Sequence, residues 1–324
     1  MKKALVTIGI ILLVIIVLIA ALFLIGAYKN ERYYKYAVTE GSIEKKYSAL
    51  GSYDVSHTEF DAKTAEYGKY ALWYPSKPEG EDSMYPVVIW ANGTGSTSST
   101  YKAFLTHLAS WGFIAVGNDD QNTRTGASLE ETIQFLIAEN ENKDSIFYGK
   151  IDLDNIGIGG HSQGGPAVFN MVTDQEHGSM VKALYAVSAT SSYHTENYKD
   201  GWEYDIAKVN IPTFLTAGTG SFDAGTAESK DQISDEKSGV MQGICPLWSL
   251  NENYDLLPET IVKVMARKKN VDHGNSHLQF DGYMTAWFMW QLQGDTEAAK
   301  AFIGDSPELL NNSLYQDQRI DLEE

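Results

Sequence analysis

The sequence predicts an α/β protein with a mostly parallel central sheet and helices on both faces. Short apolar runs, typical of strands buried on both sides, alternate with segments of helical periodicity, as in parallel sheets whose strands are joined by helices. An early pair of alternating segments, 53–60 and 67–74, predicts a hairpin and hence an antiparallel edge. The other expected strands are 86–91, 113–117, 155–159, 181–187, 212–217 and 260–266, and the expected helices are 101–111, 129–139, 166–173 and 281–292.

The chain begins with an apolar segment over residues 1–27. Two lysines precede an uncharged run from Ala4 to Ala27. About 20 apolar residues span a bilayer as a helix, whereas the apolar run of a cleaved signal peptide is usually about 7–15 residues long. We therefore expect an uncleaved transmembrane anchor over residues 4–27, with a cleaved signal peptide as the alternative. Either interpretation places the rest of the chain outside the cytoplasm, on a single-pass membrane protein or as a secreted one.

Behind this segment the sequence predicts one domain. Residues 28–50 are expected to be a tether and residues 51–324 the α/β domain. Within the domain, residues 224–258 are polar and carry many Gly, Ser and charged residues. We expect this stretch to be an insertion or a cap between two strands.

Composition excludes several classes of partner. The chain has 25 basic and 43 acidic residues, a net charge of −18. This argues against nucleic acid, whose phosphates need a basic surface, and against attachment to anionic lipid by charge. The single cysteine, Cys245, leaves no internal disulfide and no cysteine-based zinc site. No metal and no cofactor is expected.

The most informative motif is G-x-S-x-G, formed by Gly160, Ser162 and Gly164. It lies between an expected strand and an expected helix, which is the context of a nucleophile elbow. Such a turn needs positive φ at the serine and glycines where side chains would collide with backbone. It raises the serine oxygen to a helix N-terminus, where the dipole favours developing negative charge. Ser162 is therefore the candidate nucleophile, and His161 is expected to pack under the turn.

An elbow serine requires an acid later in the chain and then a histidine. Asp223 follows the expected strand 212–217 closely, at the sheet edge where ligands bind in such folds. We predict Asp223 as the acid, with Asp231 and Asp255 as alternatives.

The base is expected after the next strand, 260–266. His273 is the histidine nearest to the end of that strand, and His277 is the alternative. The oxyanion hole needs one backbone N–H from the residue after the nucleophile, Gln163, and one from the loop after an early strand. Thr94, in a glycine-bearing loop after the strand 86–91, is the predicted second donor.

With these motifs the chain resembles the α/β-hydrolases of the bacterial cutinase, polyester hydrolase and chlorophyllase/dienelactone hydrolase-like group. The resemblance covers most of residues 50–304. It implies the α/β-hydrolase fold, a Ser162–Asp223–His273 triad and an oxyanion hole at Thr94 and Gln163. The matching segments are PVVIWANGTG, LASWGFIAVGNDDQNT, NIGIGGHSQGG, IPTFLTAGTGSFD, DHG and GYMTAWFMWQLQGD.

The sequence also differs from these families. Residues 188–192 stand where polyester hydrolases have an aromatic clamp, their disulfides are missing, and residues 224–258 exceed the equivalent loop, so a polymeric substrate is not expected. Dienelactone hydrolases use a cysteine where this chain has Ser162. We predict a membrane-anchored, extracytoplasmic serine hydrolase that cleaves small or lipid-like carboxylic esters through an acyl-enzyme. An acyltransferase or peptidase with the same triad, or a catalytically silent binding ectodomain, remains an alternative.

Overall fold

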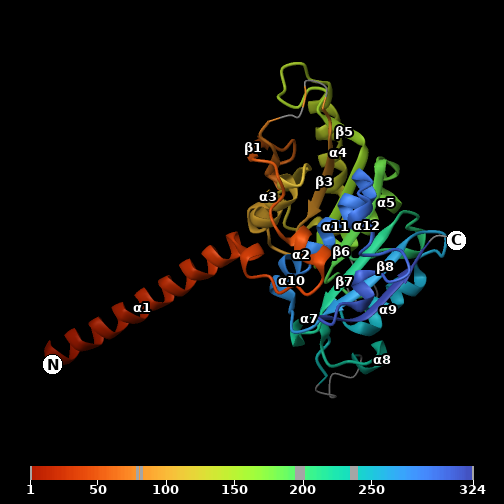
Figure 1. Ribbon diagram of the computed structural model, residues 1–324. Coiled ribbons are helices and arrows are strands. Elements are labelled where there is room, and N and C mark those ends of the chain that lie inside the picture. The colour runs from red at the N-terminus through yellow and green to blue at the C-terminus, as the bar shows by residue number, and fades with distance from the viewer. Residues whose placement is uncertain (1, 78–79, 81–82, 194–200, 234–239, 323–324) are drawn as a thin grey trace. The chain divides into compact units, whose positions relative to one another are not determined.

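The computed structural model describes residues 2–77, 80, 83–193, 201–233 and 240–322, and divides the chain into two compact units, Met1–Ala37 and Val38–Glu324 (Figure 1). The first unit consists of α1 (Lys2–Glu31) and the 3₁₀ turn η1 (Tyr33–Lys35). Within α1, Ile10–Glu31 is long and apolar enough to cross a membrane, and none of the side chains described in it is buried. A signal sequence can have the same length and apolar composition, so α1 is a candidate membrane span.

The second unit is built on a mixed sheet. In the described part of the chain nine strands form it, in the order β1-β2-β4-β3-β5-β6-β7-β8-β9. The neighbours from β4 to β8 are parallel, while β1, β2 and β9 pair antiparallel. The strands are β1 (Val55–Asp61), β2 (Lys69–Pro75), β3 (Tyr85–Ala91), β4 (Ile114–Asn118), β5 (Ile151–His161), β6 (Val181–Val187), β7 (Thr213–Gly218), β8 (Lys263–Lys268) and β9 (Tyr315–Asp321).

This sheet confirms the predicted mostly parallel arrangement with a hairpin at one edge. The strand β9 at the other edge was not predicted, because its residues are mostly polar and only half-buried. Such a strand shows no apolar alternation from which it could be recognised.

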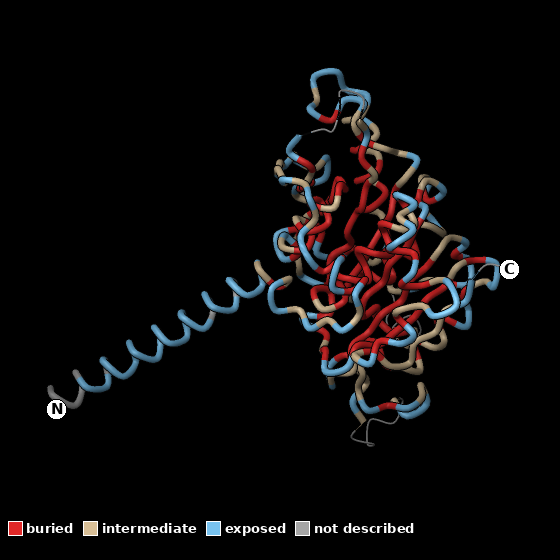
Figure 2. Tube along the Cα trace, in the orientation of Figure 1, coloured by how far each residue is buried: buried red, intermediate tan, exposed pale blue. Residues whose placement is uncertain are grey.

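Helices cover both faces of the sheet because successive side chains of a strand point to opposite sides. In β3, Val87 and Ile89 belong to the core shared with α4 and α5, whereas Trp90 packs edge-on against Phe104 of α3. The buried residues follow the central strands (Figure 2). The longer helices are α3 (Lys102–Ser110), α4 (Ala127–Glu141), α5 (Gly164–Asp174), α9 (Leu247–Leu256) and α11 (Asp281–Gln293). The short ones are α2 (Ser42–Ser48), α7 (Ser221–Ala224), α8 (Lys230–Ile233), α10 (Ser276–Gln279), α12 (Thr296–Ala299) and α13 (Glu308–Asn311). The remaining 3₁₀ turns are η2 (Ala65–Tyr67), η3 (Ser98–Tyr101), η4 (Thr123–Thr125), η5 (Gly178–Met180), η6 (Ile206–Lys208) and η7 (His273–Asn275).

The expected tether, residues 28–50, is shorter than predicted. From Val38 the chain belongs to the α/β unit, and α2 packs against α11. Glu44 of α2 is 1% exposed, and its carboxylate accepts hydrogen bonds from Lys268 Nζ at 2.7 Å and Tyr315 Oη at 2.6 Å. Its partners come from the distant C-terminal part of the chain, so the local sequence has the appearance of a polar linker.

The expected insertion, residues 224–258, does not form one separate segment in the structure. Its last part forms α9, which crosses from β7 to β8 and buries Leu250 and Tyr254 against the sheet. Of the rest, residues 234–239 lie outside the described part. The helix α9 therefore packs on β7 and β8 as part of the α/β unit.

Candidate active site

The elbow is formed where β5 ends and α5 begins. Ser162 has φ of 59°, the left-handed conformation that side chains rarely adopt. A Cβ atom on Gly160 would lie 2.1 Å from the carbonyl oxygen of Gly164, and one on Gly164 would lie 2.3 Å from the carbonyl oxygen of Ala91. Only glycine fits at both positions, so the serine oxygen is held above the sheet at the N-terminus of α5.

Three side chains from separate loops meet at this turn. The Ser162 hydroxyl donates to His273 Nε2 at 3.0 Å, and His273 Nδ1 donates to Asp223 Oδ1 at 3.1 Å. The donation to the carboxylate fixes the proton on Nδ1 and leaves Nε2 as an acceptor. The arrangement can withdraw a proton from the serine hydroxyl.

Asp223 is fully buried, and both of its carboxylate oxygens are hydrogen-bonded. Oδ2 accepts the backbone N–H of Gly218 at 2.6 Å and the hydroxyl of Ser188 at 2.7 Å. Ser188 is itself held at φ of 50° directly after β6. Its place in a Ser/Thr-rich stretch gave no signal of this contact, which depends on the strained turn.

Among the described residues, the backbone N–H groups of Thr94 and Gln163 have no hydrogen-bond partner. Thr94 lines the cleft together with Ser162, and Gln163 directly follows Ser162 in the chain. Gln163 precedes the first turn of α5, where N–H groups lack helical acceptors. Its side chain is buried, and Nε2 donates to the carbonyl oxygen of Gln121 at 2.7 Å. Free amides near a nucleophile are the elements of an oxyanion hole.

The alternative candidates have other surroundings. His277 is 5% exposed, and burial together with the neighbouring His273 lowers its pKa to about 3. Its ring faces His161 at 5.1 Å between centroids. Asp255 pairs with Arg319 Nη2 at 2.8 Å, and Asp231 lies exposed on α8.

Sequence reasoning missed Asp272. Its carboxylate accepts three backbone N–H groups, those of Asp223 at 2.8 Å, His273 at 2.9 Å and Phe222 at 3.3 Å. Although burial by itself raises the pKa of Asp272, these three donors hold it below the usual range of an aspartate. The only sequence signal was its position directly before His273.

The cleft above Ser162 has a volume of about 400 Å³. Its lining combines the polar groups of the site with the apolar side chains of Phe222 and Ile244. The Phe222 side chain is 57% exposed and meets the His273 ring edge-on, with centroids 5.4 Å apart. The cleft therefore offers a substrate one aromatic wall directly beside the histidine.

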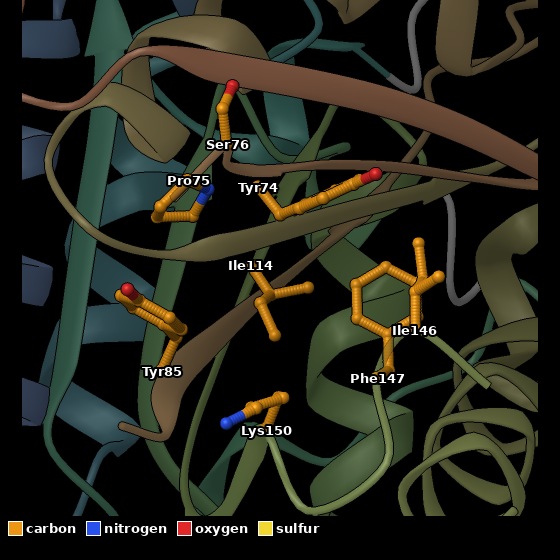
Figure 3. A pocket seen from close by; sticks show the side chains of 8 residues that line it. All are labelled: Tyr74, Pro75, Ser76, Tyr85, Ile114, Ile146, Phe147 and Lys150. Carbon is orange, nitrogen blue, oxygen red and sulfur yellow. The ribbon is translucent and has the colours of Figure 1, made fainter. Parts of the chain in front are cut away.

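A second cavity, of about 290 Å³, lies at the other end of the strands, where β3 and β4 begin and β2 ends (Figure 3). It is lined by Tyr74, Pro75, Ser76, Tyr85, Ile114, Ile146, Phe147 and Lys150. Away from both cavities, Glu130, Glu176 and His177 approach one another closely enough to ligate a metal ion. Two of the three already pair, with His177 Nδ1 2.5 Å from Glu130 Oε1.

The sheet order and the elbow after β5 define an α/β-hydrolase. Residues 35–232 match the model of the family described as "PETase: PET hydrolase-like", and the chain belongs to this family of PET hydrolase- and cutinase-like α/β-hydrolases. No curated protein matches the chain. The match confirms the resemblance inferred from the sequence and implies a hydrolase that acts on esters. It includes Ser162 and Asp223 and ends before His273.

Proposed function

We propose that the chain is a serine carboxylic ester hydrolase with Ser162 as nucleophile, His273 as base and Asp223 as acid. The observation that carries the proposal is the continuous hydrogen-bonded series from Ser162 Oγ through His273 to Asp223, with distances of 3.0 and 3.1 Å. The Gly160–Gly164 turn and the PET hydrolase-like family support the same chemistry.

In the proposed mechanism, His273 Nε2 takes the hydroxyl proton as Ser162 Oγ bonds to the ester carbonyl carbon. The N–H groups of Thr94 and Gln163 stabilise the resulting oxyanion. The tetrahedral intermediate expels the alcohol, which receives the proton from His273, and leaves an acyl-serine. Water then attacks the acyl-serine with the same proton transfers and releases the carboxylic acid. Asp223 holds the histidine tautomer and stabilises the imidazolium.

The substrate class that we propose is a small or lipid-like ester. A cleft of about 400 Å³ is in the range of small-molecule sites, and its lining provides one exposed aromatic side chain, Phe222. We further propose that α1 anchors the protein in the cell membrane with the catalytic unit outside the cytoplasm. The apolar length of Ile10–Glu31 supports the anchor.

The test uses the full chain in detergent micelles. A fluorophosphonate probe should label the wild type at Ser162, and p-nitrophenyl esters of increasing acyl length should be hydrolysed. Ser162→Ala should lose labelling and about 10⁴–10⁶ in kcat while keeping its circular dichroism spectrum. Ser306→Ala, at an exposed position, is the matched control.

Four outcomes would contradict the proposal. A wild type that is not labelled would favour a binding ectodomain. If Ser162→Ala keeps more than a tenth of the wild-type activity, Ser162 is not the nucleophile. Faster cleavage of peptides than of esters, or transfer to an added alcohol in preference to water, would favour a peptidase or an acyltransferase.

A further inference from the structure

Two buried side chains in the lining of the cleft, Tyr101 and His161, take no part in the mechanism above. We propose that they are positioning residues, which hold the oxyanion loop, the nucleophile and the base in fixed relation to one another. The inference rests on the proposed function of Ser162 and His273. Its basis is a set of hydrogen bonds that connects all three loops.

The hydrogen bonds form a series in which each group donates to the next, from the N–H of Gly93 to the carbonyl oxygen of His273. The backbone N–H of Gly93 donates to Tyr101 Oη at 2.8 Å, Tyr101 Oη lies 3.1 Å from His161 Nδ1, and His161 Nε2 lies 3.0 Å from the carbonyl oxygen of His273. A carbonyl oxygen only accepts, so the proton of His161 is on Nε2. Nδ1 must then accept, and the Tyr101 hydroxyl donates to it.

Three members of the series, Gly93, His161 and His273, belong to or directly precede residues of the proposed site. Gly93 directly precedes Thr94, His161 directly precedes Ser162, and the last acceptor is the backbone of His273 itself. A shift of the Tyr101–His161 pair would therefore move an oxyanion donor, the nucleophile and the base relative to one another.

Both groups keep their hydrogen-bonding roles over the working pH range. Burial, then the neighbouring His277 and His273, lowers the pKa of His161 well below its usual value. Burial raises the pKa of Tyr101 above its usual value. A neutral imidazole and a neutral phenol preserve the direction of every donor.

The packing leaves little freedom around the pair. A Cβ atom on Gly93 would lie 3.1 Å from Tyr101 Oη, 3.2 Å from His161 Nδ1 and 3.4 Å from Ser162 Cβ. The oxyanion loop is thus in close contact with Tyr101, His161 and the nucleophile. Removing the Tyr101 hydroxyl leaves the N–H of Gly93 and Nδ1 of His161 without partners in a buried place.

The first test is Tyr101→Phe in the full chain in detergent. Because misplacement of about 1 Å costs roughly 100-fold in rate, we expect kcat to fall about 10–100-fold with KM changed less than about threefold. The rate of fluorophosphonate labelling should fall in parallel, with one label per chain still reached. Tyr185→Phe is the matched control, since it removes another buried hydroxyl, which bonds Thr216 in the core, and should leave kcat unchanged.

The second test compares two variants of His161. Glutamine can still donate an N–H to the carbonyl oxygen of His273, whereas phenylalanine cannot. We expect His161→Gln to retain at least about fivefold more activity than His161→Phe. This fivefold margin corresponds to a net hydrogen bond of about 1 kcal/mol.

These results separate positioning from mere stability. A lowered melting temperature of Tyr101→Phe with kcat at the wild-type level would overturn the inference, as would equal activities of the two His161 variants. If Tyr101→Phe does not fold, the His161 comparison decides. A Ser162→Ala variant that stays active contradicts the proposed function, whereas an inactive Ser162→Ala with a normal Tyr101→Phe contradicts this inference alone.

Discussion

The carboxylate of Asp272 accepts the backbone N–H of Asp223 at 2.8 Å and so fastens the loop of the proposed acid to the loop of the proposed base. The same Oδ1 atom accepts the N–H of His273 at 2.9 Å. Two loops that lie 50 residues apart in the chain are therefore joined through their backbones. Their side chains, Asp223 and His273, meet as a consequence of this link.

The Asp272 link predicts a pH-dependent contribution to stability. The folded-state pKa of Asp272 is lowered, so its carboxylate stabilises the fold above the unfolded-state pKa of roughly 4, and this contribution is lost as the pH falls through the folded-state pKa. Asp272→Asn should therefore unfold at a lower urea concentration than the wild type at pH 7, with the difference shrinking below about pH 4. Asp144→Asn, at an exposed position, is the control and should match the wild type throughout. An Asp272→Asn defect that is equally large at pH 3 and pH 7 would contradict the prediction.

A comparison of two histidines tests the assignment of the base. His273→Ala should lose about 10⁴–10⁶ in kcat, because among the described residues no other group accepts the proton of Ser162. His277→Ala should have a much smaller effect, since no hydrogen bond among the described residues joins His277 to Asp223 or Ser162. Steady-state hydrolysis of one short-chain ester by both variants makes the comparison. The reverse ranking would show that the base is His277.

The elbow and its partners could be predicted because their signals are local. Two glycines flank Ser162, and Asp223 and His273 follow strands that apolar runs reveal. By contrast, Asp272 and Tyr101 act through backbone groups that only the folded chain brings near, and no periodicity marks them. Glu44 was placed in a tether for the same reason.

Substitution of Asp223 tests the acid. Asp223→Asn keeps the size but removes the charge that faces His273 Nδ1 and selects its tautomer, so kcat should fall about 10⁴-fold. Asp231→Asn and Asp255→Asn should change kcat by less than about fivefold, because both are exposed and the second pairs with Arg319. Ester hydrolysis by the three variants, at matched circular dichroism, gives the ranking. If Asp255→Asn instead shows the large loss of kcat, the acid is Asp255 on α9.

We expect Phe222 to determine which acyl chain length the cleft prefers. Its backbone is fixed, since its N–H donates to Asp272 Oδ2 and its carbonyl oxygen accepts the N–H of Ile244 at 3.1 Å. The ring itself is 57% exposed beside His273 and is free to cover an apolar part of an ester. Contact over about 50 Å² of apolar surface contributes roughly 1.3 kcal/mol, or about tenfold in kcat/KM.

Phe222→Ala should therefore lower kcat/KM for p-nitrophenyl hexanoate about tenfold more than for p-nitrophenyl acetate, because only the longer acyl chain has enough apolar surface to lie against the ring. Phe222→Leu, which keeps an apolar side chain, should recover most of the preference for hexanoate. The measurement is the ratio of the two kcat/KM values in each variant, which cancels differences in active enzyme concentration. An equal loss with both esters would mean that the ring acts by holding His273 and does not touch the acyl group.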